Sequence, residues 1–365
     1  MRPKSFTVNL YRIPSRREQR NALETFTEYE YAVVRIDFDN GIEGIGWTYT
    51  QGRGGTAVLH LLRDYYGPAL INEGISSPDE LNRKASSLTY SYGLEGVSRI
   101  ALSALDLALW DALSKGADYP LYLMLGGKRG SKVRAYRSEI DLNYTVEELR
   151  AECSAFREAG FTAFKIKVGK ESVEEDVRRI RAVRDVIGEG SELMVDANRK
   201  WSLKEALRRG RKFQEEGVYW LEEPVEAEAL EDYKVLRRSL DLRIAAGETV
   251  YNRLHALRLI NEGCVDVVQF DVLRVGGITE WLKLAHTAEL QGLPVAPHFG
   301  EEIAVQTLNA VPNALFLEHL RNSNLHDSGV LSSSYRLEGG FAYPPEAPGH
   351  GIQFNWEALY KYRVA

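Results

Sequence analysis

Hydrophobic and polar positions along the chain follow two different patterns, with a change near residue 127. In the first part, alternating apolar and polar residues predict three strands, at 6–13, 29–38 and 43–49. Asn40-Gly41 is a hairpin-turn signal between the second and third of them. Helical patterns follow, and the longest, at 95–115, has one apolar face. We therefore expect an α+β domain over residues 1–127.

From residue 128 onward, short apolar runs alternate with amphipathic helical patterns. Eight of these runs predict strands, at 132–136, 162–168, 192–196, 218–222, 243–247, 265–271, 293–297 and 314–318. Several intervening helices start with the Ser/Thr-x-x-Glu pattern of a capping box. Eight strands alternating with helices predict a TIM-type barrel over 128–325. A doubly wound open sheet is the alternative, disfavoured because no glycine-rich dinucleotide fingerprint follows the first strand.

Three segments are expected to lie outside these regular elements. The irregular segment 326–365 is rich in Gly, Pro and Ser, and its end is expected to pack back on the N-terminal domain. Residues 14–27 are polar and carry Arg16, Arg17 and Arg20, and residues 50–55 are rich in glycine. Both are candidates for flexible lids, with plain surface loops as the alternative.

Composition narrows the class of protein. The 365 residues are 44% hydrophobic and 27% charged, with a net charge of −6, which is ordinary for a soluble globular protein. There is no basic stripe to indicate nucleic acid, and no apolar run long enough to span a membrane. The two cysteines form no metal-spaced pair, and the first residues do not resemble a secretory signal. We expect a reduced, cytoplasmic protein.

Lys165 and Lys167 lie in one predicted strand with Ile166 between them. Strand side chains alternate, so both lysines point to the same face. Two ammonium groups inside a fold need an anionic partner, and burial lowers a lysine pKa toward the range of a usable base. The alternative is an edge strand with two solvated lysines.

Polar or ionisable residues stand at the C-terminal end of nearly every predicted barrel strand, where barrel enzymes carry their catalytic groups. They are Ser138, Lys165, Lys167, Asp196, Glu222, Glu248, Asp271, His298 and Glu318. The carboxylates of Asp196, Glu222 and Glu248 come from three neighbouring strands and would repel one another without a cation. Oxygen ligands in this number suit Mg²⁺, and the absence of Cys or His beside them disfavours zinc.

Across the predicted barrel from the lysines stand Asp271 and His298. An aspartate beside a histidine can fix the imidazole tautomer and raise its basicity. Lys167 and His298 would then flank one metal-bound ligand, which suits removal of a proton α to a carboxylate. Glu318 is a further candidate, because a protonated carboxyl with a raised pKa could donate a hydrogen bond to the developing oxyanion.

Read together, these motifs resemble those of the enolase superfamily, and within it the mandelate racemase subgroup. They are Lys165-Ile166-Lys167, Val195-Asp196-Ala197-Asn198, Trp220-Leu221-Glu222-Glu223-Pro224, Ala246-Gly247-Glu248, Gln269-Phe270-Asp271, Gly276-Gly277-Ile278-Thr279, Ala296-Pro297-His298 and Leu317-Glu318. The resemblance covers essentially the whole chain. It implies a modified (β/α)7β barrel whose open end is covered by an N-terminal capping domain, and a homo-oligomer, either a dimer or an octamer.

The resemblance also implies roles for individual residues. Mg²⁺ would be held by Asp196, Glu222 and Glu248, and Lys167 would oppose the His298–Asp271 dyad as acid and base. Lys165 and Glu318 would contact the oxygens of the substrate carboxylate. Asn198 would lie near a substrate hydroxyl, and Ser138 and Arg199 are further candidate substrate contacts.

Within this subgroup, similar residues serve racemases and acid-sugar dehydratases. The arginine-rich segment 14–27 favours a polar substrate, and the loop with Arg53 resembles that of galactarate/talarate-type dehydratases. We expect elimination of water from a sugar acid, an aldarate or an aldonate, to give a 2-keto-3-deoxy acid. Arg53 or an arginine of 14–27 could meet a distal carboxylate. The alternatives are a racemase or epimerase of a 2-hydroxy acid, and a non-catalytic barrel that binds sugar acids.

Overall fold

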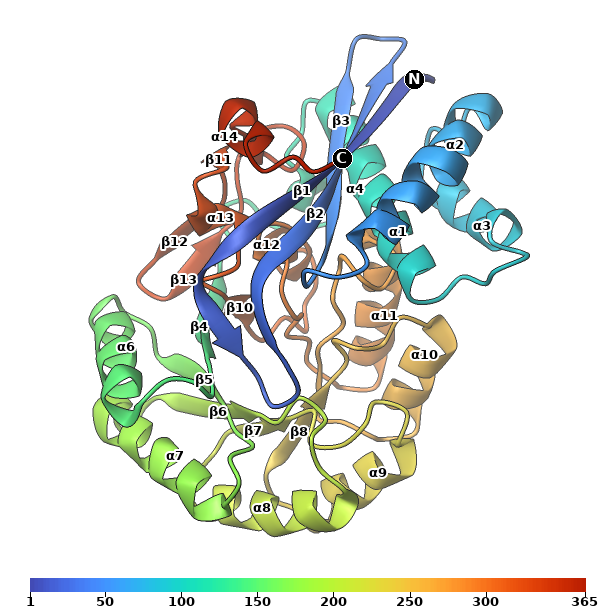
Figure 1. Ribbon diagram of the computed structural model, residues 1–365. Coiled ribbons are helices and arrows are strands. Elements are labelled where there is room, and N and C mark those ends of the chain that lie inside the picture. Colours follow the sequence, from blue (N-terminus) through green and yellow to red (C-terminus); the bar gives the residue numbers. More distant parts are fainter.

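The computed structural model describes residues 1–365 and has two parts (Figure 1). The N-terminal part is built on an antiparallel sheet in the order β1-β2-β3, formed by β1 (Pro3–Arg20), β2 (Thr25–Phe38) and β3 (Glu43–Thr50). Its other elements are α1 (Gly55–His60), a π-helical turn (Leu61–Tyr66), α2 (Gly67–Glu73), α3 (Pro78–Leu88), α4 (Val97–Gly116) and α5 (Leu121–Met124). None of the helices is long and apolar enough to cross a membrane.

Two glycines in β3 let α4 approach the sheet closely. A Cβ on Gly44 would lie 2.2 Å from the carbonyl oxygen of Ala108, and one on Gly46 would lie 2.0 Å from that of Ala104. The almost entirely buried α4 therefore packs its backbone directly on β3, and the two elements form the centre of the N-terminal core.

The β1–β2 hairpin corrects the expectation that residues 14–27 form a loop. Both strands continue through this segment, and Gln19 stands opposite Phe26 after a shift in register. Ladder hydrogen bonds therefore override the polar composition, and the charged side chains find partners on the barrel: Arg17 pairs with Glu148 at 3.0 Å. In Figure 1 the hairpin extends from the N-terminal part toward the mouth of the barrel.

The second part is a barrel of eight strand positions. They are β4 (Val133–Ile140), β5 (Ala163–Lys167), β6 (Glu192–Asp196), β7 (Trp220–Glu222), β8 (Arg243–Ala246), β9 (Val267–Val268), a single bridge residue, Val295, and β10 (Leu317–His319). Val295 forms parallel bridges to Val268 and Ala314, and β10 pairs with β4, which closes the barrel. The prediction of a TIM-type barrel is confirmed.

Seven helices connect the eight strand positions. They are α6 (Val146–Glu158), α7 (Val173–Ile187), α8 (Leu203–Glu215), α9 (Leu230–Ser239), α10 (Arg253–Asn261), α11 (Ile278–Leu290) and α12 (Glu301–Leu308). Thr145 and Ser172 cap α6 and α7 with complete capping boxes, as the sequence predicts. Because no long helix follows β10, the barrel is of the (β/α)7β form rather than a complete eightfold repeat.

One apolar residue from each strand position fills the floor of the barrel. These residues are Tyr136, Ala163, Met194, Trp220, Ala245, Val267, Ala296 and Phe316. The rings of Tyr136 and Trp220 are 5.5 Å apart although their strands are not neighbours, so both point to the barrel axis. Side chains alternate along a strand, so the residues two positions later point inward as well, one layer nearer the mouth.

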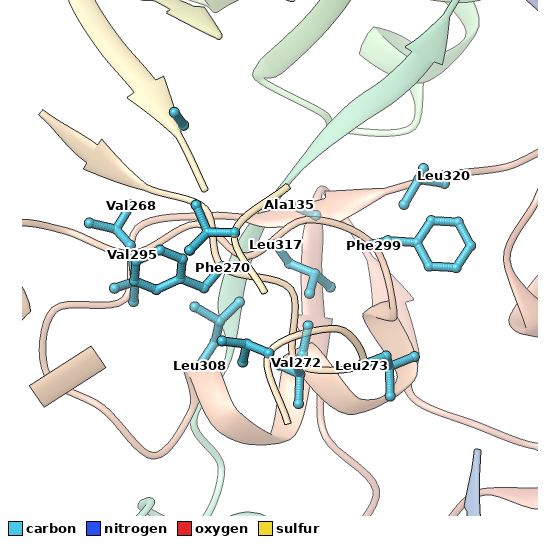
Figure 2. Packing of buried hydrophobic residues seen from close by; sticks show 14 of the residues in the cluster. Ala135, Val268, Phe270, Val272, Leu273, Val295, Phe299, Leu308, Leu317 and Leu320 are labelled. Atoms are coloured by element: carbon cyan, nitrogen blue, oxygen red, sulfur yellow. The ribbon is translucent and has the colours of Figure 1, made fainter. Parts of the chain in front are cut away.

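A larger apolar core surrounds the barrel strands. Figure 2 shows part of it, where Val268, Val295 and Leu317 from three successive strand positions gather with Phe270 and Leu308. These buried side chains fix the spacing between the strands, so the polar residues at the strand ends stand on a rigid frame.

The C-terminal segment returns to the N-terminal sheet. Its elements are α13 (Leu325–Ser328), β11 (Leu331–Ser333), β12 (Arg336–Glu338), β13 (Phe341–Tyr343), β14 (Gln353–Phe354) and α14 (Trp356–Tyr360). The backbone N–H of Leu10 donates to the carbonyl of Ala365 at 2.7 Å, and that of His350 donates to the Asp111 carboxylate at 3.0 Å. The last residues thus tie the barrel to the domain that covers its mouth.

Candidate active site

The barrel mouth carries one layer of polar side chains, and each follows the apolar floor by two residues along its strand. This layer consists of Ser138, Lys165, Asp196, Glu222, Gln269, His298 and Glu318. Gly247 occupies the position on β8, where a Cβ would lie 2.9 Å from the backbone nitrogen of Phe270. The sequence alternation alone therefore places these groups inside one ring.

Two carboxylates of the ring and that of Glu248, the residue after Gly247, could hold a metal ion. Ligand oxygens of Asp196, Glu222 and Glu248 lie within 4.8 Å of one another, and all three residues are buried. Oε2 of Glu248 has no hydrogen-bond partner within the protein. An oxygen donor set with a free buried lone pair fits a hard divalent cation.

Glu222 is held in place by neutral donors as well as by charge. Nε1 of Trp220 and Nε2 of Gln269 donate to its Oε2 at 3.1 and 2.7 Å. Burial and, after it, the nearby acids, Asp196 first, raise the pKa of Glu222 to about 7 against the opposing attraction of Lys165. A cation among the three carboxylates would remove this penalty.

Lys165 is buried and is surrounded by acids. Its ammonium lies 2.5 Å from Glu222, 2.8 Å from Glu318 and 3.9 Å from Asp196. The alternative of a solvated edge strand is therefore wrong. Burial lowers the pKa of Lys165, but the attraction of the acids outweighs burial and raises the pKa well above that of an ordinary lysine. The amine is therefore a fixed positive charge next to the carboxylate cluster.

Lys167 differs from the expectation in one respect. It is partly buried and forms an ion pair with Asp196. Burial lowers its pKa, as expected, but the charge of Asp196 opposes burial and prevails, so the pKa is raised rather than lowered. The sequence showed the crowding of two lysines but not the distance to the carboxylate that compensates it.

His298 and Asp271 form the dyad that the sequence predicts. Nδ1 of His298 lies 2.9 Å from Oδ2 of Asp271, and Nε2 lies 3.5 Å from Glu248. Burial lowers the His298 pKa, but the charge of Glu248 and the hydrogen bond to Asp271 outweigh it, so the pKa is raised. Tyr49 donates from its hydroxyl to Oδ2 of Asp271 at 2.6 Å, which orients the carboxylate from the covering domain.

The expected raised pKa of Glu318 is wrong for this arrangement. Burial raises the pKa of Glu318, but the ammonium of Lys165 and the charge of His298 lower it by more than burial raises it. The net shift of the pKa is therefore downward. Ser138 and the backbone N–H of Phe299 donate to the two oxygens at 2.7 and 3.0 Å. Glu318 is therefore an ionised acceptor here rather than a hydrogen-bond donor.

The ring opens into a cavity of about 260 Å³ between the barrel mouth and the β1–β2 hairpin. Lys167, Asn198, Arg199, His298 and Glu318 line it, and most of the other lining side chains are also polar.

The arginines expected near a distal carboxylate do not line the cavity. Arg53 is exposed and lies outside the lining residues, and its neighbour Gln51 lines the cavity instead. The guanidinium of Arg17 stacks on Tyr144, and Arg16 donates to the backbone carbonyl of Asp327. Polar side chains of the hairpin face the cavity in their place, at Gln19, Asn21 and Glu24.

Backbone strain is concentrated around this cavity. Six non-glycine residues have positive φ, and five of them line it: Glu139, Asn198, Arg199, Glu223 and Phe299. All five lie at the C-terminal end of a barrel strand position or within four residues after it. Such conformations persist where surrounding structure fixes them, and they typically mark functional sites.

Sequence reasoning missed four residues of the site. Tyr49 donates to Asp271 and Gln269 donates to Glu222. Arg274 lies 3.6 Å from Asp271 and 4.0 Å from Glu248. Glu139, at the end of β4, accepts from Nε2 of Gln19 at 2.6 Å. Gln269 could have been found from the alternation along its strand, and Arg274 from its spacing of three residues from Asp271, but Tyr49 comes from a distant sheet with no local signal.

Comparison with known proteins identifies the family. Residues 7–126 match the mandelate racemase/muconate lactonizing enzyme N-terminal domain, and residues 148–358 match the enolase C-terminal domain-like family. The arabinonate dehydratase of Saccharolobus solfataricus is 32% identical over 341 residues, with 92% of this chain and 91% of the relative covered. The L-talarate/galactarate dehydratase of Salmonella typhimurium is 34% identical over 333 residues, with 91% and 82% covered.

Solved structures agree with this assignment. A racemase from Streptomyces coelicolor A3(2), crystallised with bound magnesium, superposes with a TM-score of 0.93 at 29% identity, over 99% of this chain and 100% of that one. Both the motifs and the capped barrel are therefore shared with proteins of one group. The chain belongs to the mandelate racemase/muconate lactonizing enzyme family of the enolase superfamily.

Proposed function

We propose that this protein is a Mg²⁺-dependent dehydratase of sugar acids. The observation that carries the proposal is the placement of two proton-transfer groups, Lys167 and His298, in one cavity beside a cluster of three carboxylates, one of which, Glu248, lines the same cavity. Such a set suits abstraction of a proton next to a carboxylate, followed by loss of a β-hydroxyl. The polar cavity wall supports a polyhydroxylated substrate over an aromatic hydroxy acid.

Asp196, Glu222 and Glu248 would hold the metal, and their all-oxygen donor set supports Mg²⁺. When bound, Mg²⁺ supplies positive charge that stabilises negative charge developing on the substrate carboxylate. With Asp196 held as a ligand, its ion pair with Lys167 would be weaker. Burial, which lowers the lysine pKa, would then be less opposed, and the pKa of the amine would come closer to the range of a general base.

Residues of the chain itself orient the substrate and transfer the protons. Lys165 orients the substrate carboxylate from its fixed place among the acids. One of Lys167 and His298 removes the α-proton. The electron pair of the broken C–H bond forms the double bond as the β C–O bond breaks, and His298 as an imidazolium protonates the leaving hydroxyl to water. The enol product then ketonises to a 2-keto-3-deoxy acid.

The curated relatives support this reaction, because two of them are dehydratases of sugar acids by name. The racemase among the similar structures favours the alternative of proton transfer without elimination, which uses the same two groups. Retention or loss of the hydroxyl therefore separates the two reactions, and the substrate's α-hydrogen reports on both.

The experiment is incubation of the purified protein and Mg²⁺ with a panel of aldonates and aldarates in D₂O, followed by proton NMR. Dehydration predicts a new 2-keto-3-deoxy acid. Deuterium at the α-carbon with all hydroxyls retained would instead identify a racemase or epimerase. Binding without exchange or elimination for every compound would leave only the non-catalytic alternative.

A further inference from the structure

The wall of the cavity carries buried oxygens that the protein itself leaves without hydrogen-bond partners. They are Oε1 of Gln19, Oδ2 of Asp141, Oδ1 of Asn198 and Oε2 of Glu223. All four residues line the cavity, and each is at least nine-tenths buried. Gln19 comes from the β1–β2 hairpin and the others from the ends of barrel strands, so the oxygens belong to two sides of one space.

The two amides among these residues have a defined orientation. Nε2 of Gln19 donates to the carboxylate of Glu139 at 2.6 Å, and Nδ2 of Asn198 donates to Asp196 at 3.3 Å. Because a carboxylate only accepts, the nitrogen of each amide must face it, and the free atom must be the oxygen. The free atoms of both amides are therefore hydrogen-bond acceptors, and the free carboxyl oxygens of Asp141 and Glu223 accept in the ionised form.

Acceptors can be satisfied only by donors. A sugar hydroxyl donates one hydrogen bond and also accepts, whereas an ionised carboxylate only accepts. Nε of Arg199 makes no hydrogen bond and lies 3.8 Å from Oε2 of Glu223, so a hydroxyl between the two atoms could accept from the first and donate to the second. A chain of hydroxyl groups therefore complements this wall, and a second carboxylate would leave the buried oxygens unpaired.

The charges of the cavity wall also disfavour a second carboxylate on the substrate. Beyond Lys167 and His298, the cavity is lined by two cations, Arg199 and Arg274. Arg199 lies 3.8 Å from Glu223 and 3.4 Å from Glu226, and Arg274 is placed between Asp271 and Glu248. Each cation is already paired with two acids.

Further acids line the cavity with no paired cation. Glu24 of the hairpin is exposed, and Asp141 after β4 is buried. A second substrate carboxylate would meet these negative charges without a free positive partner.

We infer that the site selects monocarboxylic sugar acids, with the hydroxylated tail donating to Gln19, Asp141, Asn198 and Glu223, and that it discriminates against dicarboxylic ones. The inference rests on the proposed sugar-acid function and narrows it to aldonates. Specificity then comes from the hairpin and from the ends of β4, β6 and β7, not from the arginines of the segment 14–27.

Matched pairs of substrates test the inference directly. D-Gluconate and D-glucarate share their configuration and differ in the oxidation of one terminal carbon, as do D-galactonate and galactarate. With Mg²⁺, kcat/KM for the preferred aldonate should exceed that of its paired aldarate by at least roughly tenfold. An aldarate used as well as, or better than, its aldonate would overturn the inference while leaving the dehydratase proposal intact.

A variant at Asp141 tests whether this wall causes the preference for aldonates over aldarates. Burial raises the pKa of Asp141 to about 7, so the test is made at pH 8, where the carboxyl is mostly ionised. Asp141→Asn then removes a negative charge at nearly constant size and should reduce the aldonate-to-aldarate ratio of kcat/KM by roughly threefold or more. Glu147→Gln, the same loss of charge on the exposed surface of α6, is the matched control and should leave the ratio unchanged. An unchanged ratio in Asp141→Asn would contradict the role given to this wall.

Binding separates this inference from the proposed reaction. If no sugar acid is turned over, the dehydratase proposal fails, and thermal shifts of the Lys167→Met variant with Mg²⁺ and each acid decide the specificity. Stabilisation by an aldonate but not by its paired aldarate would support the inference. Equal or greater stabilisation by the aldarate, or none by either, would overturn it.

Discussion

Nδ1 of His298 lies 2.9 Å from Oδ2 of Asp271, and the same carboxylate oxygen accepts a hydrogen bond of 2.6 Å from the hydroxyl of Tyr49. The acid thus links the barrel histidine to the domain that covers the barrel. This arrangement fixes the imidazole with its Nε2 toward Glu248 and the cavity.

Asp271→Asn should lower kcat by roughly 100-fold or more, because the neutral amide no longer stabilises the imidazolium or fixes its tautomer. It should also shift the His298 limb of the pH–rate profile to lower pH, since the hydrogen bond to Asp271 helps to raise the His298 pKa. Steady-state kinetics across pH measure both effects. Tyr49→Phe keeps the dyad and should have a much smaller effect; an equal loss in both variants would contradict this role of Asp271.

Lys167→Met should reduce turnover by roughly 100-fold to 10,000-fold, because a thioether cannot transfer a proton. Mg²⁺-dependent binding of a sugar acid should persist, since Lys165 and the three carboxylates are unchanged. Turnover assays and calorimetry on the same preparation test the two parts. Lys204→Met, at an exposed position on α8, is the control, and normal turnover in Lys167→Met would remove this residue from the mechanism.

The metal-free protein should lose stability as pH rises from about 4.5 to about 8. Burial raises the pKa of Asp106 to about 7 and that of Glu302 to about 8. The folded state therefore holds more protons than the unfolded state across this window, and its advantage falls as they are released. Urea unfolding in EDTA at several pH values measures the trend.

Glu302→Gln provides the control for this titration. Glu302 accepts from the backbone N–H of His326 at 2.7 Å, and the amide oxygen can keep this bond. The variant should flatten the fall in stability at the alkaline end of the window. Stability that rises between pH 5 and 8 in the wild-type protein would contradict the direction of these shifts.

Glu139→Ala should weaken the docking of the β1–β2 hairpin. Glu139 accepts from Gln19 and from the backbone N–H of Asn322 at 2.7 Å, so its loss leaves buried donors unpaired at a cost of about 1–3 kcal/mol. We expect a higher KM and faster proteolysis within the hairpin. Arg17→Ala removes a half-exposed ion pair worth about 0–1 kcal/mol and a stacking contact with Tyr144, leaves no buried donor unpaired, and should change both quantities by less.

The sequence predicted the barrel and the ring of polar strand ends because both depend on local periodicity. Alternation along a strand places Lys165 and Glu318 inward regardless of the rest of the fold. The course of segment 14–27 and the partners of Tyr49 depend on long-range pairing. The pKa directions of Lys167 and Glu318 depend on distances of a few ångströms between charges, and no pattern along the chain specifies these.

The central claim is that Asp196, Glu222 and Glu248 share one cation, and titration of Mg²⁺ into the metal-free protein by calorimetry at pH 8 tests it without any assumption about the substrate. One ion should bind per chain, and Asp196→Asn should weaken binding by at least roughly tenfold, whereas the control Glu226→Gln, at an exposed acid, should not. No Mg²⁺ binding by the wild-type protein, or undiminished binding by Asp196→Asn, would contradict the account.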